Sequence, residues 1–264
     1  MVQENLFAMT ILTFLAMYRI PTALFLAAAL LISSATFAQN SRQFTQQEVY
    51  EKMTQKRNPY NLPIIDNVES YNALVREKRK NRLVDLEKYI PGIRLDIRYA
   101  TPNNFTGTQV YTMPKAYLVK EAAKALRKAQ RELRKEGLGF VIYDAYRPYA
   151  ATFYFREVYH DTTFVASPTT GSIHNRGCAV DLALVHIKTG EYLVMPTEFD
   201  NFTEKASADY PDITAEQLAN REKLRGVMEK HGFIINSDEW WHYNLKDNKR
   251  FPLLDISFEE LQNL

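Results

Sequence analysis

Two short segments of the sequence each pair a histidine with a carboxylate. In the first, residues 172–181 read SIHNRGCAVD and contain His174 and Asp181. Their odd spacing would place the two side chains on opposite faces of an uninterrupted strand. A turn over residues 175–177, which include a glycine, would fold His174 back toward Asp181. This pair alone indicates either two ligands of a zinc site or an ordinary ion pair.

The second segment, residues 237–243, reads SDEWWHY and contains Glu239 and His242. His242 offers a third metal ligand, and Glu239 offers a base outside the metal's coordination, which is the combination that hydrolytic zinc requires. In a regular strand these two side chains would face opposite sides, so the backbone must bend near Glu239. The two tryptophans between them are explained equally well as core packing.

The segments that carry these residues are expected to be strands. Apolar and alternating runs predict strands over 140–143, 178–185, 192–195, 233–235 and 240–245, with a turn over 188–191 before the third of them. The strand 140–143 leads directly into Asp144 and Arg147. Asp181 lies among small apolar neighbours on one face of its strand.

Helices are expected between these strands. Apolar residues at three- and four-residue steps predict helices over 68–87, 116–136 and 149–159. Thr214, with Gln217 three residues later, forms a capping box for a further helix that stops at Gly232. The order of the elements predicts one α+β domain, with helices packed on a mainly antiparallel sheet and the zinc site at the sheet centre.

The composition of the chain excludes several classes of protein. The 264 residues are 46% hydrophobic and 24% charged, with a formal net charge of +2, so a disordered or collagen-like chain is excluded. Acids are interleaved with the bases, which argues against nucleic acid as a partner. The one cysteine, Cys178, forms neither an internal disulfide nor a cysteine-based zinc cage. Any metal must therefore be held by histidine and carboxylate.

The first 38 residues differ in character from the rest. Residues 6–37 are almost continuously apolar, Arg19 is their only charge, and small residues before Gln39 form a cleavage pattern. This predicts a signal peptide over 1–38, cleaved after Ala38, and hence export to the periplasm or cell envelope with no remaining membrane span. An uncleaved membrane anchor is the alternative, because about 20 apolar residues can cross a bilayer.

The polar residues that follow predict a loose arm before the folded domain. Residues 39–61 are rich in Gln, Asn, Lys and Arg with little apolar periodicity, so we expect a tether or loosely packed arm. Residues 62–264 then form the expected catalytic domain. The sequence carries no signal for the oligomeric state.

Four strings, in order, resemble the zinc D-alanyl-D-alanine dipeptidases. They are DIRYATPNNFTG (96–107), YDAYRP (143–148), SIHNRGCAVDLAL (172–184) and EWWH (239–242). The resemblance extends from about residue 93 to about residue 245. The wider superfamily of zinc D-Ala-D-Ala carboxypeptidases and cell-wall endopeptidases shares the histidine, aspartate and Glu-x-x-His skeleton, whereas the first two strings resemble the dipeptidase branch.

The resemblance implies a role for each chemical residue. His174, Asp181 and His242 would bind one Zn²⁺ per chain, and Glu239 would be the general base and acid. Arg147 would stabilise the tetrahedral intermediate, since a fixed cation can meet the developing oxyanion.

Three further positions resemble substrate contacts. Tyr99 and Asp200 match residues assigned to the free ammonium end of the substrate, and Ser172 matches another contact; each could instead be structural. The implied reaction is hydrolysis of a small D,D-dipeptide, D-alanyl-D-alanine. The alternatives are an exported zinc D,D-carboxypeptidase or endopeptidase acting on peptidoglycan stem peptides, and a noncatalytic zinc or cell-wall binding module. The resistance-linked members of the family are cytosolic and carry no leader, so the leader expected here distinguishes this chain from them.

Overall fold

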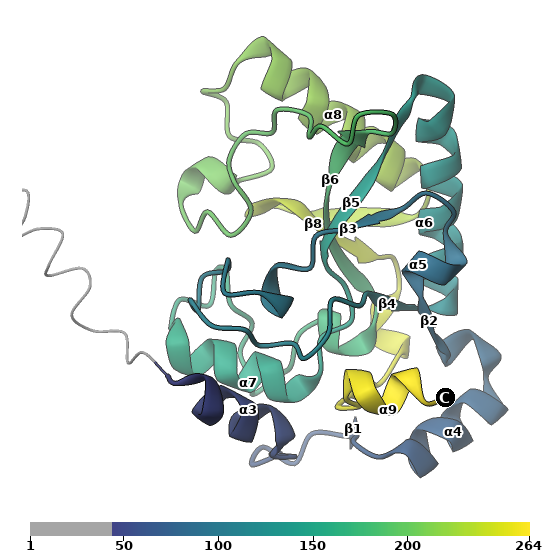
Figure 1. Ribbon diagram of the computed structural model, residues 1–264, viewed down its shortest axis with the longest axis vertical. Helices are drawn as coiled ribbons and strands as arrows, with labels where there is room; N and C mark the ends of the chain where they lie inside the picture. Colours follow the sequence, from purple (N-terminus) through teal and green to yellow (C-terminus); the bar gives the residue numbers. More distant parts are fainter. Residues whose placement is uncertain (1–43) are drawn as a thin grey trace, which may run out of the picture. The chain divides into compact units, whose positions relative to one another are not determined.

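A five-stranded sheet organises the fold, in a computed structural model that describes residues 44–264 (Figure 1). In spatial order its strands are β3 (Arg94–Leu95), β5 (Leu138–Asp144), β6 (Ala179–His186), β8 (Glu239–Leu245) and β7 (Phe233–Asn236). Only the β3–β5 pair is parallel within this sheet. Two short pairs lie outside it: β1 (Ile64–Ile65) with β9 (Leu253–Leu254), and β2 (Leu83–Asp85) with β4 (Tyr117–Val119). The predicted mainly antiparallel α+β architecture is confirmed.

Helices surround this sheet (Figure 1). They are α3 (Gln46–Thr54), α4 (Val68–Glu77), α5 (Leu86–Tyr89), α6 (Lys120–Leu133), α7 (Tyr149–Val158), α8 (Ala215–Lys230) and α9 (Phe258–Gln262). The helices α6 and α8 contact each other as well as the sheet, through buried apolar side chains on one face of each. The capping box of Thr214 and Gln217 is present at the start of α8, as predicted.

The register of the three central strands places acidic and imidazole side chains in one row. Asp144 of β5 pairs with Asp181 of β6, and Asp181 pairs with His242 of β8. Because residues directly opposite each other in a sheet share a face, these three side chains lie side by side. The row crosses the middle of the sheet and brings together side chains from three neighbouring strands.

Two predicted helices are shorter than expected. The helix predicted over 68–87 ends at Glu77, where residues 78–82 are mostly charged and offer little apolar surface to bury. The helix predicted over 116–136 begins only at Lys120. Residues 83–85 and 117–119, which the predictions counted as helical, form β2 and β4 instead. These strands pair with each other, so a contact between distant segments overrides the local pattern.

The strand predicted over 192–195 is absent, and a single bridge from Tyr192 to Val185 stands in its place. Backbone bonds to β6 flank this bridge: Leu193 donates to the Leu184 carbonyl and His186 donates to the Glu191 carbonyl, each at 2.9 Å. Beyond Leu193 the carbonyls are bound by α8, because Asn220 donates to Val194 at 2.9 Å and Gln217 donates to Met195 at 3.0 Å. The pairing with β6 therefore ends after Leu193.

The described part of the expected loose arm contains a packed helix. Residues 46–54 form α3, which contacts α7, and Val49 is fully buried. Thr45 and Glu48 form a capping box at its start, and Lys52 forms an ion pair with Glu157. The expectation of a loosely packed arm is therefore wrong for these residues, because one buried side chain and good end-capping suffice where periodicity is weak.

The expected leader over 1–38 and its cleavage site lie outside the described residues. Among residues 44–264, no helix has both the length and the apolar character needed to cross a membrane.

Candidate metal centre and active site

Three side chains converge above the central strands. His174 lies on a short 3₁₀ turn (His174–Arg176), Asp181 on β6 and His242 on β8. The turn ends at Gly177, whose φ of 61° is left-handed and whose Cα has no room for a side chain, because a Cβ there would lie 2.5 Å from Leu83. The predicted turn between His174 and Asp181 is thus present, and it overcomes their unfavourable spacing.

The three ligand atoms are spaced as a tetrahedral metal site requires. Nε2 of His174 is 3.2 Å from Nδ1 of His242 and 3.4 Å from Oδ1 of Asp181. The remaining distance, from Nδ1 of His242 to Oδ1 of Asp181, is 3.0 Å. Two atoms bound to zinc at tetrahedral angles lie about 3.3–3.5 Å apart, so the observed triangle is close to that of a zinc site.

The hydrogen bonding of this cluster supports the same interpretation. Oδ1 of Asp181 is buried and has no hydrogen-bond partner among the described residues, although two imidazole nitrogens face it. A buried acceptor without a partner is costly, and a bound cation would satisfy it. Burial acts to raise the pKa of Asp181, but the adjacent imidazoles His174 and His242 outweigh it and hold that pKa below its usual value. The residues present therefore fit Zn²⁺.

The far nitrogen of each imidazole is held by an acceptor. Nδ1 of His174 lies 2.6 Å from the carbonyl oxygen of Ala145, and Nε2 of His242 lies 2.9 Å from Oδ1 of Asn244. Each acceptor fixes the tautomer in which the other nitrogen, facing the cluster, is free of hydrogen and able to bind metal. Ala145 and Asn244 thus fix the orientation of the two imidazole rings through the nitrogens that face away from the cluster.

Glu239 stands beside the cluster because the sheet is irregular at this point. Ile235 pairs with Tyr243, but the next residue of β7, Asn236, pairs with Glu239. This shift confirms the predicted bend and brings Oε2 of Glu239 to 3.6 Å from Nδ1 of His242. Burial raises the pKa of Glu239 to about 7, against the opposing charge of His242. A carboxyl group with this pKa can both accept and donate a proton near neutral pH.

Arg147 lies directly after β5 and is fixed by Asp144. Its Nε and Nη2 donate to Oδ2 of Asp144 at 3.0 and 2.8 Å. Burial opposes the charge, but Asp144 raises the pKa of Arg147 well above its usual value, so the guanidinium stays charged. Nη1 has no hydrogen-bond partner within residues 44–264, which leaves it available to a ligand in the cavity.

The three predicted substrate contacts line the same cavity. The Tyr99 hydroxyl donates to both carboxylate oxygens of Asp200, at 3.0 and 3.2 Å. Burial and the charges of Asp181 and Glu239 raise the pKa of Asp200 well above its usual value. Ser172 is buried, and its hydroxyl accepts a bond from the His174 backbone at 3.2 Å, so it also supports the ligand turn.

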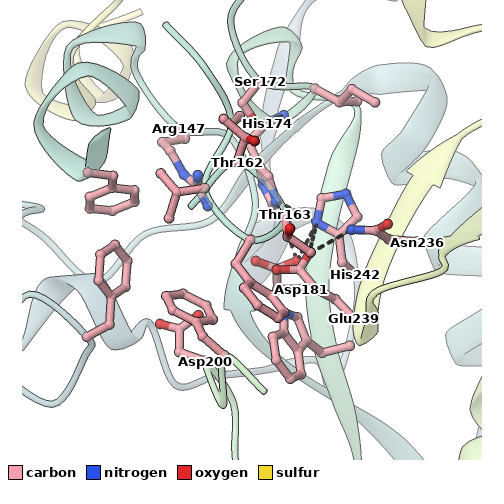
Figure 2. A pocket seen from close by; sticks show the side chains of 18 of the residues that line it. Arg147, Thr162, Thr163, Ser172, His174, Asp181, Asp200, Asn236, Glu239 and His242 are labelled. Carbon is pink, nitrogen blue, oxygen red and sulfur yellow. Dashed lines mark hydrogen bonds and ion pairs between the residues drawn. The ribbon is translucent and has the colours of Figure 1, made fainter. Parts of the chain in front are cut away.

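The cavity around these residues has a volume of about 270 Å³. Figure 2 shows Glu239, Asp181, His174 and His242 grouped on one side of it, with Arg147 and Asp200 further away. Aromatic side chains from several segments form much of the remaining wall; they are Tyr99, Phe105, Phe155, Phe164, Phe202 and Trp241. All eight residues predicted for the site lie on this one cavity.

Three polar residues of the site were not predicted from the sequence: Asp144, Asn236 and Asn244. Asp144 stands in the same string as Arg147, and its position at a strand end was a usable signal. Asn244 follows His242 by two residues on the strand predicted over 240–245 and so shares its face, which was also a usable signal. Asn236 gave none, because an asparagine near a strand end is most simply part of a turn.

Taken together, the three-ligand cluster, the carboxyl group beside it and the fixed cation define a metal-dependent hydrolase. The sequence matches the family described as D-ala-D-ala dipeptidase over residues 79–262. The chain therefore belongs to the D-Ala-D-Ala dipeptidase family, which is a family of zinc metallopeptidases, and it is an enzyme.

Relatives support this assignment over most of their length. The D-alanyl-D-alanine dipeptidase of Escherichia coli (strain K12) is 36% identical over 176 residues, which cover 67% of this chain and 91% of the relative. The enzyme of the same name from Enterococcus faecium is 35% identical over 182 residues, covering 61% of this chain and 90% of the relative.

More remote likenesses are found among solved structures. The vancomycin resistance D,D-pentapeptidase VanY, in complex with Zn(II), is 17% identical with a TM-score of 0.32, over 51% of this chain and 75% of that one. The LD-carboxypeptidase LdcB is 22% identical with a TM-score of 0.33, over 51% of this chain and 63% of that one.

Proposed function

We propose that this protein hydrolyses the dipeptide D-alanyl-D-alanine to two molecules of D-alanine, with one Zn²⁺ per chain. The observation that carries this proposal is the triangle of His174 Nε2, Asp181 Oδ1 and His242 Nδ1, with Glu239 beside it. Membership of the D-Ala-D-Ala dipeptidase family supports the choice of substrate.

His174, Asp181 and His242 would hold the zinc ion. When bound, zinc supplies a water molecule whose pKa is lowered toward about 7 and polarises the scissile carbonyl. A set of three protein ligands, rather than four, is typical of a catalytic rather than a structural zinc site.

Glu239 moves the proton in this mechanism. Its carboxylate takes a proton from the attacking water as the carbon–oxygen bond forms, and later gives a proton to the nitrogen of the leaving D-alanine as the peptide bond breaks. The pKa of about 7 suits both steps, because neither protonation state is strongly disfavoured at neutral pH.

Arg147 stabilises the negative charge that develops on the carbonyl oxygen. Its two bonds to Asp144 fix the guanidinium before substrate arrives, and its free Nη1 serves as the donor. A preorganised charge in a site shielded from water stabilises a transition state more than the same charge in bulk water.

Asp200 and Tyr99 bind the free ammonium group of the substrate. Burial and neighbouring acids raise the pKa of Asp200 in the free enzyme, and an ammonium group beside it would favour the ionised form and lower that pKa. A longer peptide would bring an amide to this position instead, leaving the carboxylate without its counter-charge. Ser172 contributes a second polar contact. This arrangement favours dipeptides over longer stem peptides.

The apolar leader over residues 1–38 would deliver the enzyme to the periplasm or cell envelope. There it would act on D-alanyl-D-alanine released from cell-wall peptides. Fractionation of cells that express the full chain tests this location: we expect activity in the periplasmic fraction, and activity confined to the cytosol would contradict it.

The substrate is tested with the 39–264 fragment and purified peptides. We expect release of D-alanine from free D-alanyl-D-alanine when zinc is present, and none when a chelator removes it. N-acetyl-D-alanyl-D-alanine, which lacks the ammonium group, should be a poor substrate. Hydrolysis of the acetylated peptide without hydrolysis of the free dipeptide would instead identify a stem-peptide hydrolase.

A further inference from the structure

Asn236 makes a contact that neither the sequence nor the family assignment explains. It is the last residue of β7, and its side-chain amide donates to Oε2 of Glu239 at 2.9 Å (Figure 2). At the other end of the same amide, Oδ1 accepts a bond from the backbone of Asp238 at 3.4 Å. The amide therefore spans the turn between β7 and β8 and is held at both ends.

This amide is the only hydrogen-bond donor to the Glu239 carboxylate among residues 44–264. The other polar neighbour is Nδ1 of His242, 3.6 Å from the same oxygen, which is the nitrogen expected to bind metal. Glu239 is only 7% exposed, so water does not replace a missing donor freely. The orientation of this buried carboxylate thus depends on one amide.

Packing alone does not determine how a glutamate carboxylate is rotated. The last torsion of the side chain joins a tetrahedral carbon to a planar one, and such torsions are broad and roughly two-fold. Glu239 must present an oxygen to the attacking water, and must not turn toward the metal as a further ligand. A donor bound to Oε2 fixes that rotation, and with it the position of the oxygen that accepts the proton.

We propose that Asn236 is a positioning residue for this reaction, which orients the Glu239 carboxylate as the general base. The proposal rests on the proposed function, since it assigns Glu239 that role. Asn236 lies along the cavity but acts through Glu239 rather than on the substrate. Its loss should therefore lower the rate of the chemical step without changing the binding of substrate or zinc.

The test is a double-mutant cycle on the zinc-loaded enzyme, with kcat and KM for D-alanyl-D-alanine. We expect Asn236→Leu, which keeps the side-chain volume but removes the donor, to lower kcat on the order of 10- to 100-fold. KM should stay within about twofold and zinc content should be unchanged. In a Glu239→Gln background, Asn236→Leu should have no further effect, because the group that it positions is no longer a base.

Ser237→Ala is the matched control, since Ser237 lies in the same turn and its hydroxyl contacts only Asp238. It should leave kcat unchanged. An equal loss of kcat from Asn236→Leu in both backgrounds, or loss of zinc, would overturn the proposal. Asn236→Ala serves if the leucine variant fails to fold.

A crystal structure of zinc-loaded Asn236→Leu gives a readout that does not need activity. We expect Glu239 in one orientation in the parent enzyme and in several in the variant. A single, unchanged orientation in the variant would refute the positioning role. If the parent enzyme leaves D-alanyl-D-alanine intact, the proposed function fails, and this structure still decides the role of Asn236.

Discussion

The two halves of the cavity are built in different ways. The first, here called the sheet half, comprises Asp181, His242 and Glu239 on the strands β6 and β8, with Arg147 just after β5 and His174 on the turn before β6. The second, here called the loop half, comes largely from segments 162–173 and 197–202, which contain little regular structure. The atoms proposed to meet within a few tenths of an ångström thus lie on the sheet or on short segments joined to it, whereas most of the proposed substrate contacts lie on loops.

The sheet half should control the rate of the chemical step. Among substitutions there, removal of the Arg147 side chain should lower kcat the most. We expect Arg147→Ala to lower kcat by about 10²- to 10³-fold, because a preorganised donor to the oxyanion is lost. Arg147→Lys, which keeps the charge but not the two bonds to Asp144, should be intermediate. Steady-state kinetics measure both, and a raised KM with unchanged kcat would place Arg147 in the substrate-binding half instead.

The same half should control metal affinity through Asn244. We expect Asn244→Leu to weaken zinc binding by about 10- to 100-fold, because Nε2 of His242 loses the acceptor that fixes its tautomer. Competition with a chelator of known affinity measures the effect. Zinc affinity equal to that of the parent would show that the sheet holds His242 without this support.

The loop half should control substrate affinity, and Asp200 tests this most directly. Asp200 has a left-handed backbone with φ of 59°, which asparagine also adopts readily, so Asp200→Asn removes charge with little strain. We expect KM for D-alanyl-D-alanine to rise roughly tenfold while kcat changes much less. Tyr99→Phe, which removes only the donor to Asp200, should have a smaller effect. A fall in kcat at constant KM would remove the distinction between the two halves.

The last expected effect concerns the pH dependence of stability rather than activity. In metal-free protein, Glu239 titrates at about 7 rather than its usual 4.5, so the native state holds a proton that the unfolded state releases. The contribution of the Glu239 carboxyl to the free energy of unfolding should therefore be greatest below pH 4.5. It should fall as the pH rises to 7.

For that change we expect about 2 kcal/mol between pH 5 and 7, measured by urea unfolding with chelator present. Glu239→Gln should flatten the dependence in this interval. An unchanged slope in the variant would show that the burial of Glu239 does not perturb its protonation.

The elements that carry the sheet half were predicted well from the sequence. The strands that carry Asp181 and His242 have continuous apolar runs, and these stayed strands in the structure. The requirement for a bend at Glu239 followed from strand geometry alone. The site residues themselves rested on the family resemblance, because spacing could not separate a zinc ligand from an ion-pair partner.

What the sequence did not reveal depends on contacts between distant segments. β2 and β4 form only by pairing with each other, which helical periodicity in each segment conceals. The helix α3 is stabilised by capping and by Val49 against α7, not by a pattern within itself. Asn236 acquires its role from the shifted register of β7 and β8, which no local signal indicates. Asn244 follows His242 by two residues on β8, so the spacing of a strand alone could have indicated its contact.

The proposed zinc hydrolysis with Glu239 as the base is tested most directly by measuring zinc content and turnover in the parent and in Glu239→Gln. We expect about one zinc per chain in both proteins, with D-alanyl-D-alanine hydrolysis reduced by at least 10²-fold in the variant. Retention of both zinc and activity by Glu239→Gln would contradict the assignment of the base. A parent enzyme that hydrolyses the dipeptide without any zinc would contradict the metal centre itself.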